Sequence, residues 1–197
     1  MGQLRGVVLV AALMLPGLAS AALVDAVAVT TGTDSRASTH VNMVRLSLQK
    51  HWQQRWFTQG NWYLTGYWEL GFGYWHGNAG DTGRSHIEAV DFRPVLRLQR
   101  QVSSRDATQF YVEGGVGPAL LSATHIDNLQ FSTTFQFGSH IGAGICFGRD
   151  HRFDLEYRFM HYSNADIKKP NDGISFNVVQ LGRRINAVHP PLALSLQ

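Results

Sequence analysis

The chain has 197 residues, with 17 Lys and Arg against 14 Asp and Glu, so its formal charge is only +3. Basic and acidic residues are mixed along the chain, and this excludes the basic stripe or patch of a nucleic-acid-binding protein. The single cysteine, Cys146, excludes an internal disulfide, and the length favours one domain.

The first 21 residues have the parts of a secretory signal peptide in the right order. Arg5 supplies a positive charge, residues 7–15 form a short apolar run, and Ala19-Ser20-Ala21 is a small-residue cleavage site. The apolar run is shorter than the ~20 residues that a membrane-spanning helix needs. We therefore expect residues 1–21 to be removed and one domain to occupy residues 22–197.

Alternation of apolar and polar residues dominates the rest of the chain. In residues 62–75 the even positions, which include Trp68 and Phe72, are apolar, whereas the odd positions carry Glu69, hydroxyls and glycines. An even number of long strands, joined by long loops at one end and tight turns at the other, is typical of an outer-membrane barrel. The pattern predicts an all-β, eight-stranded antiparallel outer-membrane β-barrel with strands at residues 23–31, 40–50, 62–75, 90–98, 110–120, 131–147, 153–164 and 174–185.

A secreted soluble barrel that packs its apolar face inward is the alternative fold, because such sheets also alternate. The predicted polar faces, however, carry glycines and opposed charges that suit a narrow lumen, and eight strands enclose no aqueous channel. Buried charges need partners, so we expect a lumen plug made by His140, Glu69, Asp91, Arg93, Arg97, Glu113, Asp154, Glu156 and Arg158. Aromatic residues near strand ends predict a membrane girdle formed by Trp52, Trp56, Trp62, Tyr74 and Trp75.

The predicted strand 153–164 ends with His161 and Ser163, two residues apart. Side chains at this spacing share one face of a strand and could exchange a proton, as in a serine hydrolase. Both continue the apolar row that is expected to face lipid. A tilted strand places them roughly 28 Å above the turn at Asp150, near the outer rim of the apolar band. The spacing alone also fits simple interfacial residues at the end of a strand.

The run from His161 to Ile174, HYSNADIKKPNDGI, resembles the outer-membrane lipid A 3-O-deacylases, the PagL family. The resemblance implies a serine esterase in the outer membrane of a Gram-negative bacterium. Such an enzyme removes the 3-hydroxyacyl chain at position 3 of lipid A in lipopolysaccharide, without metal or cofactor. It implies that His161 is the general base and Ser163 the nucleophile, and that Asn164 stabilises the oxyanion through its side chain or backbone N–H.

The chain departs from the family at one position. The resemblance implies a glutamate fourteen residues after the histidine that orients the imidazole. Ser175 occupies that position here. Asp172 is the first candidate for a replacement carboxylate and Asp166 the second, while Asn177 could orient a neutral imidazole. The alternative function is therefore a non-enzymatic barrel that has lost this acid, such as an adhesin or a membrane-integrity protein.

Three features outside this motif stay open. Lys168 and Lys169 could pair with lipid A phosphates as point charges or could be solvated loop residues. His76, His86 and His125 have no tight ligand spacing, so no metal site is predicted. The sequence leaves a homodimer open, and it ends in a tail, residues 186–197, that is not expected to belong to a strand.

Overall fold

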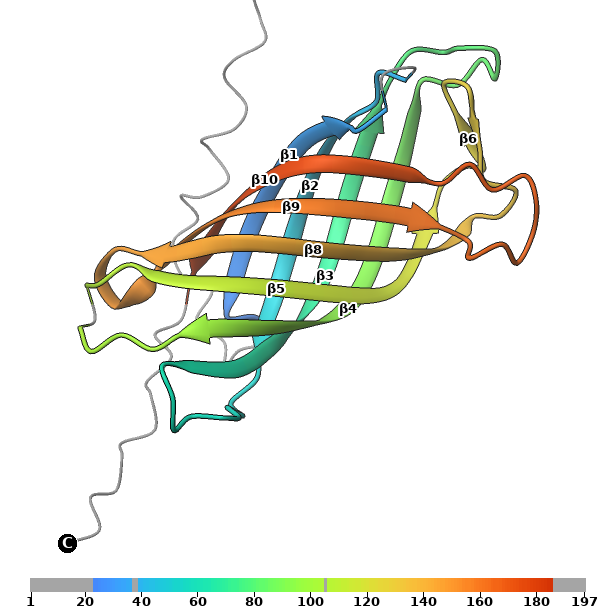
Figure 1. Cartoon of the computed structure of the whole chain (residues 1–197). Coiled ribbons are helices and arrows are strands. Elements are labelled where there is room, and N and C mark those ends of the chain that lie inside the picture. Colours follow the sequence, from blue (N-terminus) through green and yellow to red (C-terminus); the bar gives the residue numbers. More distant parts are fainter. Residues whose placement is uncertain (1–22, 37–38, 105, 186–197) are drawn as a thin grey trace, which may run out of the picture.

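The computed structural model describes residues 23–36, 39–104 and 106–185, so the expected signal peptide and the tail 186–197 lie outside the described residues. Each strand of the barrel pairs antiparallel with its neighbours, and β1 pairs with β10 to close it (Figure 1). The predicted fold is confirmed. In the described part of the chain the barrel strands are β1 (Ala26–Asp34), β2 (Asn42–His51), β3 (Trp62–His76), β4 (His86–Arg100), β5 (Gln109–Leu121), β8 (Phe135–Phe147), β9 (Phe153–Ser163) and β10 (Ile174–Arg184).

The barrel is apolar outside and polar inside, as the alternation predicts. In β4, for example, Phe92 and Leu96 are exposed on the outer face, whereas Asp91 and Arg93 are buried in the lumen. Pro94 lies on the outer face of β4 at a gap in the pairing of β4 with β5, where its missing N–H leaves no broken ladder bond. Among the described residues, no helix combines the length and the apolar character that crossing a membrane requires.

Charged side chains fill the lumen and pair with one another. Arg158 lies 3.1 Å from Glu69 and 2.7 Å from Glu113, and Arg97 lies 2.6 Å from Glu113. All the residues of the predicted plug are buried in this network or line it. Arg45 was missed, because its strand alternates less regularly, although it binds Asp91 at 2.6 Å.

An apolar cluster covers one end of the lumen and corrects two predictions. Trp75 is fully buried there against Tyr162 and Phe176, with ring centroids 4.9 and 5.2 Å away, so it does not belong to an outer girdle. The reason is strand geometry, because Trp75 faces inward next to the outward Tyr74. Phe131 joins the same cluster from a loop, so β8 begins at Phe135 and not at residue 131.

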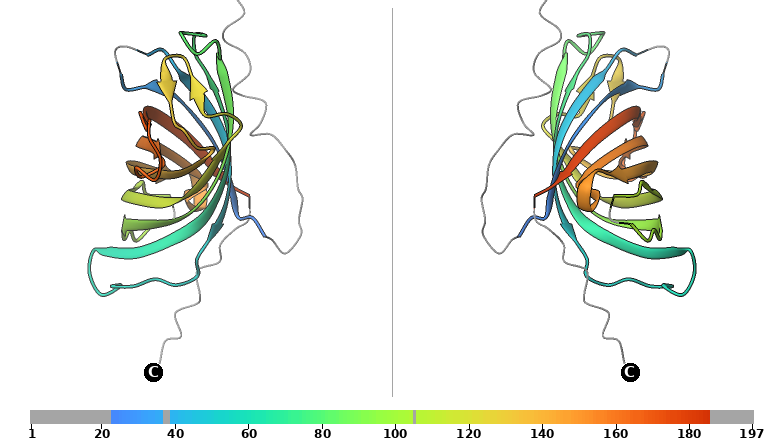
Figure 2. Two further views of the ribbon diagram at one scale, coloured as in Figure 1. Left: turned by 90° about the vertical axis from the view of Figure 1, so that its right-hand side faces the viewer. Right: turned by 90° about the vertical axis from the view of Figure 1, so that its left-hand side faces the viewer.

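The two ends of the barrel differ. The end that carries connections 35–41, 77–85, 122–134 and 164–173 is called the loop end. Connection 122–134 contains a small hairpin of β6 (His125–Ile126) and β7 (Leu129–Gln130) that projects beyond the barrel (Figure 2). The terminal end carries the start of β1, the end of β10 and connections 52–61, 101–108 and 148–152, the last of which contains the 3-10 turn η2 (Arg149–His151).

Candidate active site

His161 and Ser163 are the last outward-facing residues of β9, at the loop end. Both side chains are half-buried and follow the exposed Tyr157 and Phe159 on the same face. Phe137 of β8 is the cross-strand partner of Ser163, so an aromatic outer wall adjoins the serine.

His161 lies between two serines in register. Ser175 of β10 is its partner on one side and Ser139 of β8 on the other. Nδ1 of His161 is 2.8 Å from Oγ of Ser175, a hydrogen-bond distance. The Ser175 hydroxyl therefore contacts the imidazole from the position at which the resemblance led us to expect a carboxylate. Sequence reasoning named Ser175 only as a lost acid and missed Ser139 entirely.

The structure does not bring the predicted replacement groups to the imidazole. The carboxylate of Asp172 accepts a hydrogen bond from the backbone N–H of Gln130 at 2.7 Å, in the β6–β7 hairpin. Asp166 accepts one from the Asn171 amide at 3.0 Å. The side-chain carbonyl of Asn177 accepts one from the Tyr157 hydroxyl at 2.6 Å. Asp172 therefore anchors a loop, and the assignment of Asp172 as the orienting acid is not supported.

Asn164, next to Ser163, is buried and holds the loop that follows. Its amide group donates to the backbone carbonyls of Phe131 and Lys168, both at 2.8 Å. Its backbone N–H donates to the side-chain carbonyl of Asn171 at 3.2 Å. The side chain is buried and holds two backbone carbonyls, so it is not free to bind an oxyanion at the outer wall; the backbone N–H, whose bond to a loop side chain is longer, stays the candidate.

Backbone from the next loop packs against the imidazole. Gly173 has φ +58°, and a Cβ built on it would lie 3.0 Å from Cε1 of His161, so a larger residue would press on the ring. The guanidinium of Arg36, from connection 35–41, donates to the carbonyls of Asp172 and Gly173 and fixes this segment. Sequence reasoning missed Arg36, because it lies far from the motif along the chain.

The two lysines differ in their surroundings. Lys168 lines a polar cavity of about 400 Å³ between the hairpin and loop 164–173, together with His125 and Gln130. Lys169 is exposed, 3.8 Å from Asp166. The structure thus brings His125 and Lys168 to one cavity and leaves Lys169 outside it.

Three groups with ligand atoms within 4.8 Å of one another lie in the lumen: Glu113, His140 and Glu156. Arg158 binds Glu113 at 2.7 Å and Glu156 at 2.9 Å. A metal cation there would face a buried guanidinium, so these residues belong to the ion-pair network.

Comparisons with known proteins agree with this architecture. Residues 42–184 match the family described as "Lipid A 3-O-deacylase (PagL)". The chain is 33% identical to the lipid A deacylase PagL of Pseudomonas aeruginosa over 174 residues, which cover 88% of this chain and 94% of the relative. It is 34% identical to the lipid A deacylase PagL of Bordetella bronchiseptica over 113 residues, 57% of each chain.

A solved structure gives the same result for the fold. The crystal structure of the outer membrane enzyme PagL superposes with a TM-score of 0.72 and 28% identity, covering 81% of this chain and 99% of that one. Fold, length and motif therefore agree with one group of outer-membrane barrels. The chain belongs to the lipid A 3-O-deacylase (PagL) family.

Proposed function

We propose that this chain is an outer-membrane esterase that removes the 3-O-linked hydroxyacyl chain of lipid A by a Ser/His mechanism at the lipid-facing wall. The family match and the relatives' names support lipid A as the substrate. In outer-membrane barrels the longer connections lie on the outside of the cell, so we place the loop end there. In that orientation the site is level with the outer leaflet. Lipid A then reaches it sideways from the membrane.

The observation that carries this proposal is the hydrogen bond between His161 Nδ1 and Ser175 Oγ, with Ser163 on the same face. When Nδ1 carries the proton and donates it to Ser175, the lone pair of Nε2 is free to act as a base. Phe137 beside Ser163 offers an apolar surface for the acyl chain.

The reaction follows the general pattern of serine esterases. His161 takes the proton of Ser163 as Oγ attacks the ester carbonyl. When the bond between the carbonyl carbon and the 3-oxygen of the sugar breaks, the imidazolium gives this proton to that oxygen, which leaves as a hydroxyl. Water, deprotonated by His161, hydrolyses the acyl-serine and releases a 3-hydroxy fatty acid. We assign the oxyanion to the backbone N–H of Asn164, so the 3.2 Å hydrogen bond from this N–H to Asn171 Oδ1 must open during the reaction.

Expression of the full chain in a Gram-negative host without this activity tests the proposal. Mass spectrometry of lipid A should show the loss of one 3-hydroxyacyl chain. Among the described residues, no carboxylate is bonded to His161, and this favours one rival, a barrel descended from deacylases that has no activity. Unchanged lipid A around a folded, membrane-inserted barrel would establish that rival and overturn the proposal.

Ser175→Ala is expected to lower kcat about ten- to a hundredfold, since it removes a charge-assisted hydrogen bond to the imidazolium. KM should change little, because Ser175 acts through His161 and is not proposed to bind substrate. Ser175→Thr keeps the hydroxyl and should retain most of the activity. Steady-state kinetics on lipid A in mixed micelles separate kcat from KM.

The family residue provides a matched comparison for that prediction. Ser175→Glu restores a carboxylate that can stabilise the imidazolium and should raise kcat above that of the unaltered chain. If the Ala variant were as active as the unaltered chain, the 2.8 Å contact would have no part in catalysis.

A further inference from the structure

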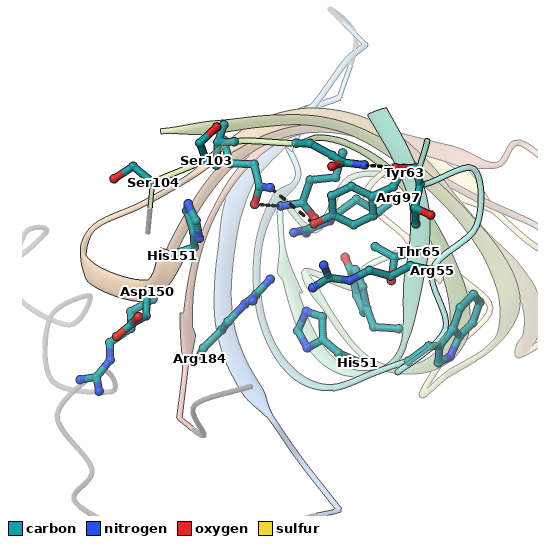
Figure 3. Close-up of a pocket in the computed structure, with 18 of the residues that line it drawn as sticks. His51, Arg55, Tyr63, Thr65, Arg97, Ser103, Ser104, Asp150, His151 and Arg184 are labelled. Carbon is teal, nitrogen blue, oxygen red and sulfur yellow. Dashed lines mark hydrogen bonds between the residues drawn. The ribbon is translucent and has the colours of Figure 1, made fainter. Parts of the chain in front are cut away.

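A cavity at the terminal end of the barrel has no role in the proposed reaction. Its volume is about 480 Å³, and it is lined by residues of connections 52–61 and 148–152, by residues 101–104 and by the end of β10 (Figure 3). Strand β9 runs from Phe153 at this end to Ser163 at the loop end, so the cavity and the candidate active site lie at opposite ends of the barrel.

Two guanidinium groups converge in this cavity. Arg55 and Arg184 enter from opposite sides and point toward each other, with the ring of His51 beside them (Figure 3). Arg55 also lies over the ring of Tyr63, 4.8 Å from its centroid. Neither guanidinium forms an ion pair with any described residue, so two positive charges share this cavity without a carboxylate partner from the described part of the chain.

The acidic residues nearby do not offset this charge. Asp150 is the one carboxylate among the described lining residues, and it lies at the turn with Arg149, 3.9 Å away. Deeper in the lumen, Glu113 and Asp154 are bound to Arg97, at 2.6 and 2.9 Å. The carboxylates of the lumen are thus engaged with lumen arginines, and the mouth of the cavity keeps an excess of positive charge.

The cavity wall also holds one polar atom without a partner. Nδ1 of His51 is buried and has no hydrogen-bond partner among the described residues. Buried polar groups in proteins are nearly always paired, so this unpaired ring nitrogen at the cavity is informative. A ligand with oxygen acceptors would suit both this wall and the guanidinium pair.

We propose that the terminal-end cavity binds a phosphate group between Arg55 and Arg184. Guanidinium groups bind phosphate through two parallel hydrogen bonds, and they are weakly hydrated, which suits a half-enclosed site. The phosphate is either free inorganic phosphate or the headgroup of an anionic phospholipid in the leaflet at this end, since basic residues at a membrane surface attract such lipids. The site goes beyond the proposed deacylation and does not depend on it.

The test measures the thermal stability of the full chain, refolded in a nonionic detergent, as inorganic phosphate is added. A saturable rise in Tm above that given by chloride at equal ionic strength is expected. A second arm compares bicelles of phosphatidylcholine with bicelles that also contain phosphatidylglycerol. A response to phosphate alone identifies a soluble ligand, and a response to phosphatidylglycerol alone identifies a lipid.

Matched variants assign any response to the cavity. Arg55→Gln and Arg184→Gln should each lower the apparent affinity for the ligand about tenfold or more, because each removes a charge-assisted hydrogen bond. Arg149→Gln removes a charge at the same end but outside the cavity lining and should leave the response unchanged. No saturable response in either arm, or an equal response in all three variants, would overturn the proposal.

Discussion

Ser163→Ala is expected to abolish deacylation, with a fall in kcat of about 10⁴-fold or more. The hydroxyl is the proposed nucleophile. Removing one member of a catalytic Ser/His unit leaves only the rate enhancement that comes from substrate binding and oxyanion stabilisation. The substitution removes one oxygen from a half-buried side chain at the end of β9, so the barrel should fold as before. Lipid A from cells that express the variant, analysed by mass spectrometry, should keep its full set of acyl chains.

Ser139→Ala is the matched control. Ser139 also faces outward and stands in register with His161, but on β8, so it tests whether any serine beside the imidazole serves as nucleophile. This variant should keep its activity. Full activity of Ser163→Ala, or an equal loss in Ser139→Ala, would falsify the assignment of Ser163.

Arg158→Met is expected to lower the free energy of unfolding by about 3–5 kcal/mol, the usual cost of breaking a buried ion-pair network. Arg158 is fully buried, and its guanidinium lies within 3.1 Å of Glu69, Glu113 and Glu156. The Tyr67 hydroxyl accepts a further hydrogen bond from it at 2.7 Å. Methionine has a similar size but leaves three carboxylates without this cation. Urea unfolding in lipid vesicles, followed by tryptophan fluorescence, measures the change.

Arg149→Met controls for the loss of an arginine as such. Its side chain is 90% exposed and lies 3.9 Å from Asp150, an arrangement that contributes little to stability. Its free energy of unfolding should stay within about 0.5 kcal/mol of that of the unaltered chain. If Arg158→Met lowered the free energy of unfolding no more than Arg149→Met does, water or other cations would have to compensate the lumen carboxylates.

The sequence alone indicated much of this protein, because a strand places alternate residues on opposite faces whatever its neighbours are. That rule was enough to separate the lipid-facing row of Phe92 and Phe159 from the buried charges of the lumen. It also assigned His161 and Ser163 to one outer face. It failed where residues leave strands, as at Phe131, which the alternation placed in β8 but which packs into the apolar cluster from a loop.

Contacts between distant segments depended on register, loop paths and closure, which alternation along one strand does not encode. The pairing of β9 with β10 sets Ser175 opposite His161, and the hairpin takes the carboxylate of Asp172 away from the imidazole. Closure of the barrel decides that Arg36, near the start of the chain, holds the loop beside the motif. Within the strands, the alternation thus determined which face a side chain takes. The tertiary structure decided which side chain contacts the imidazole, because that contact requires several separate strands to be aligned at once.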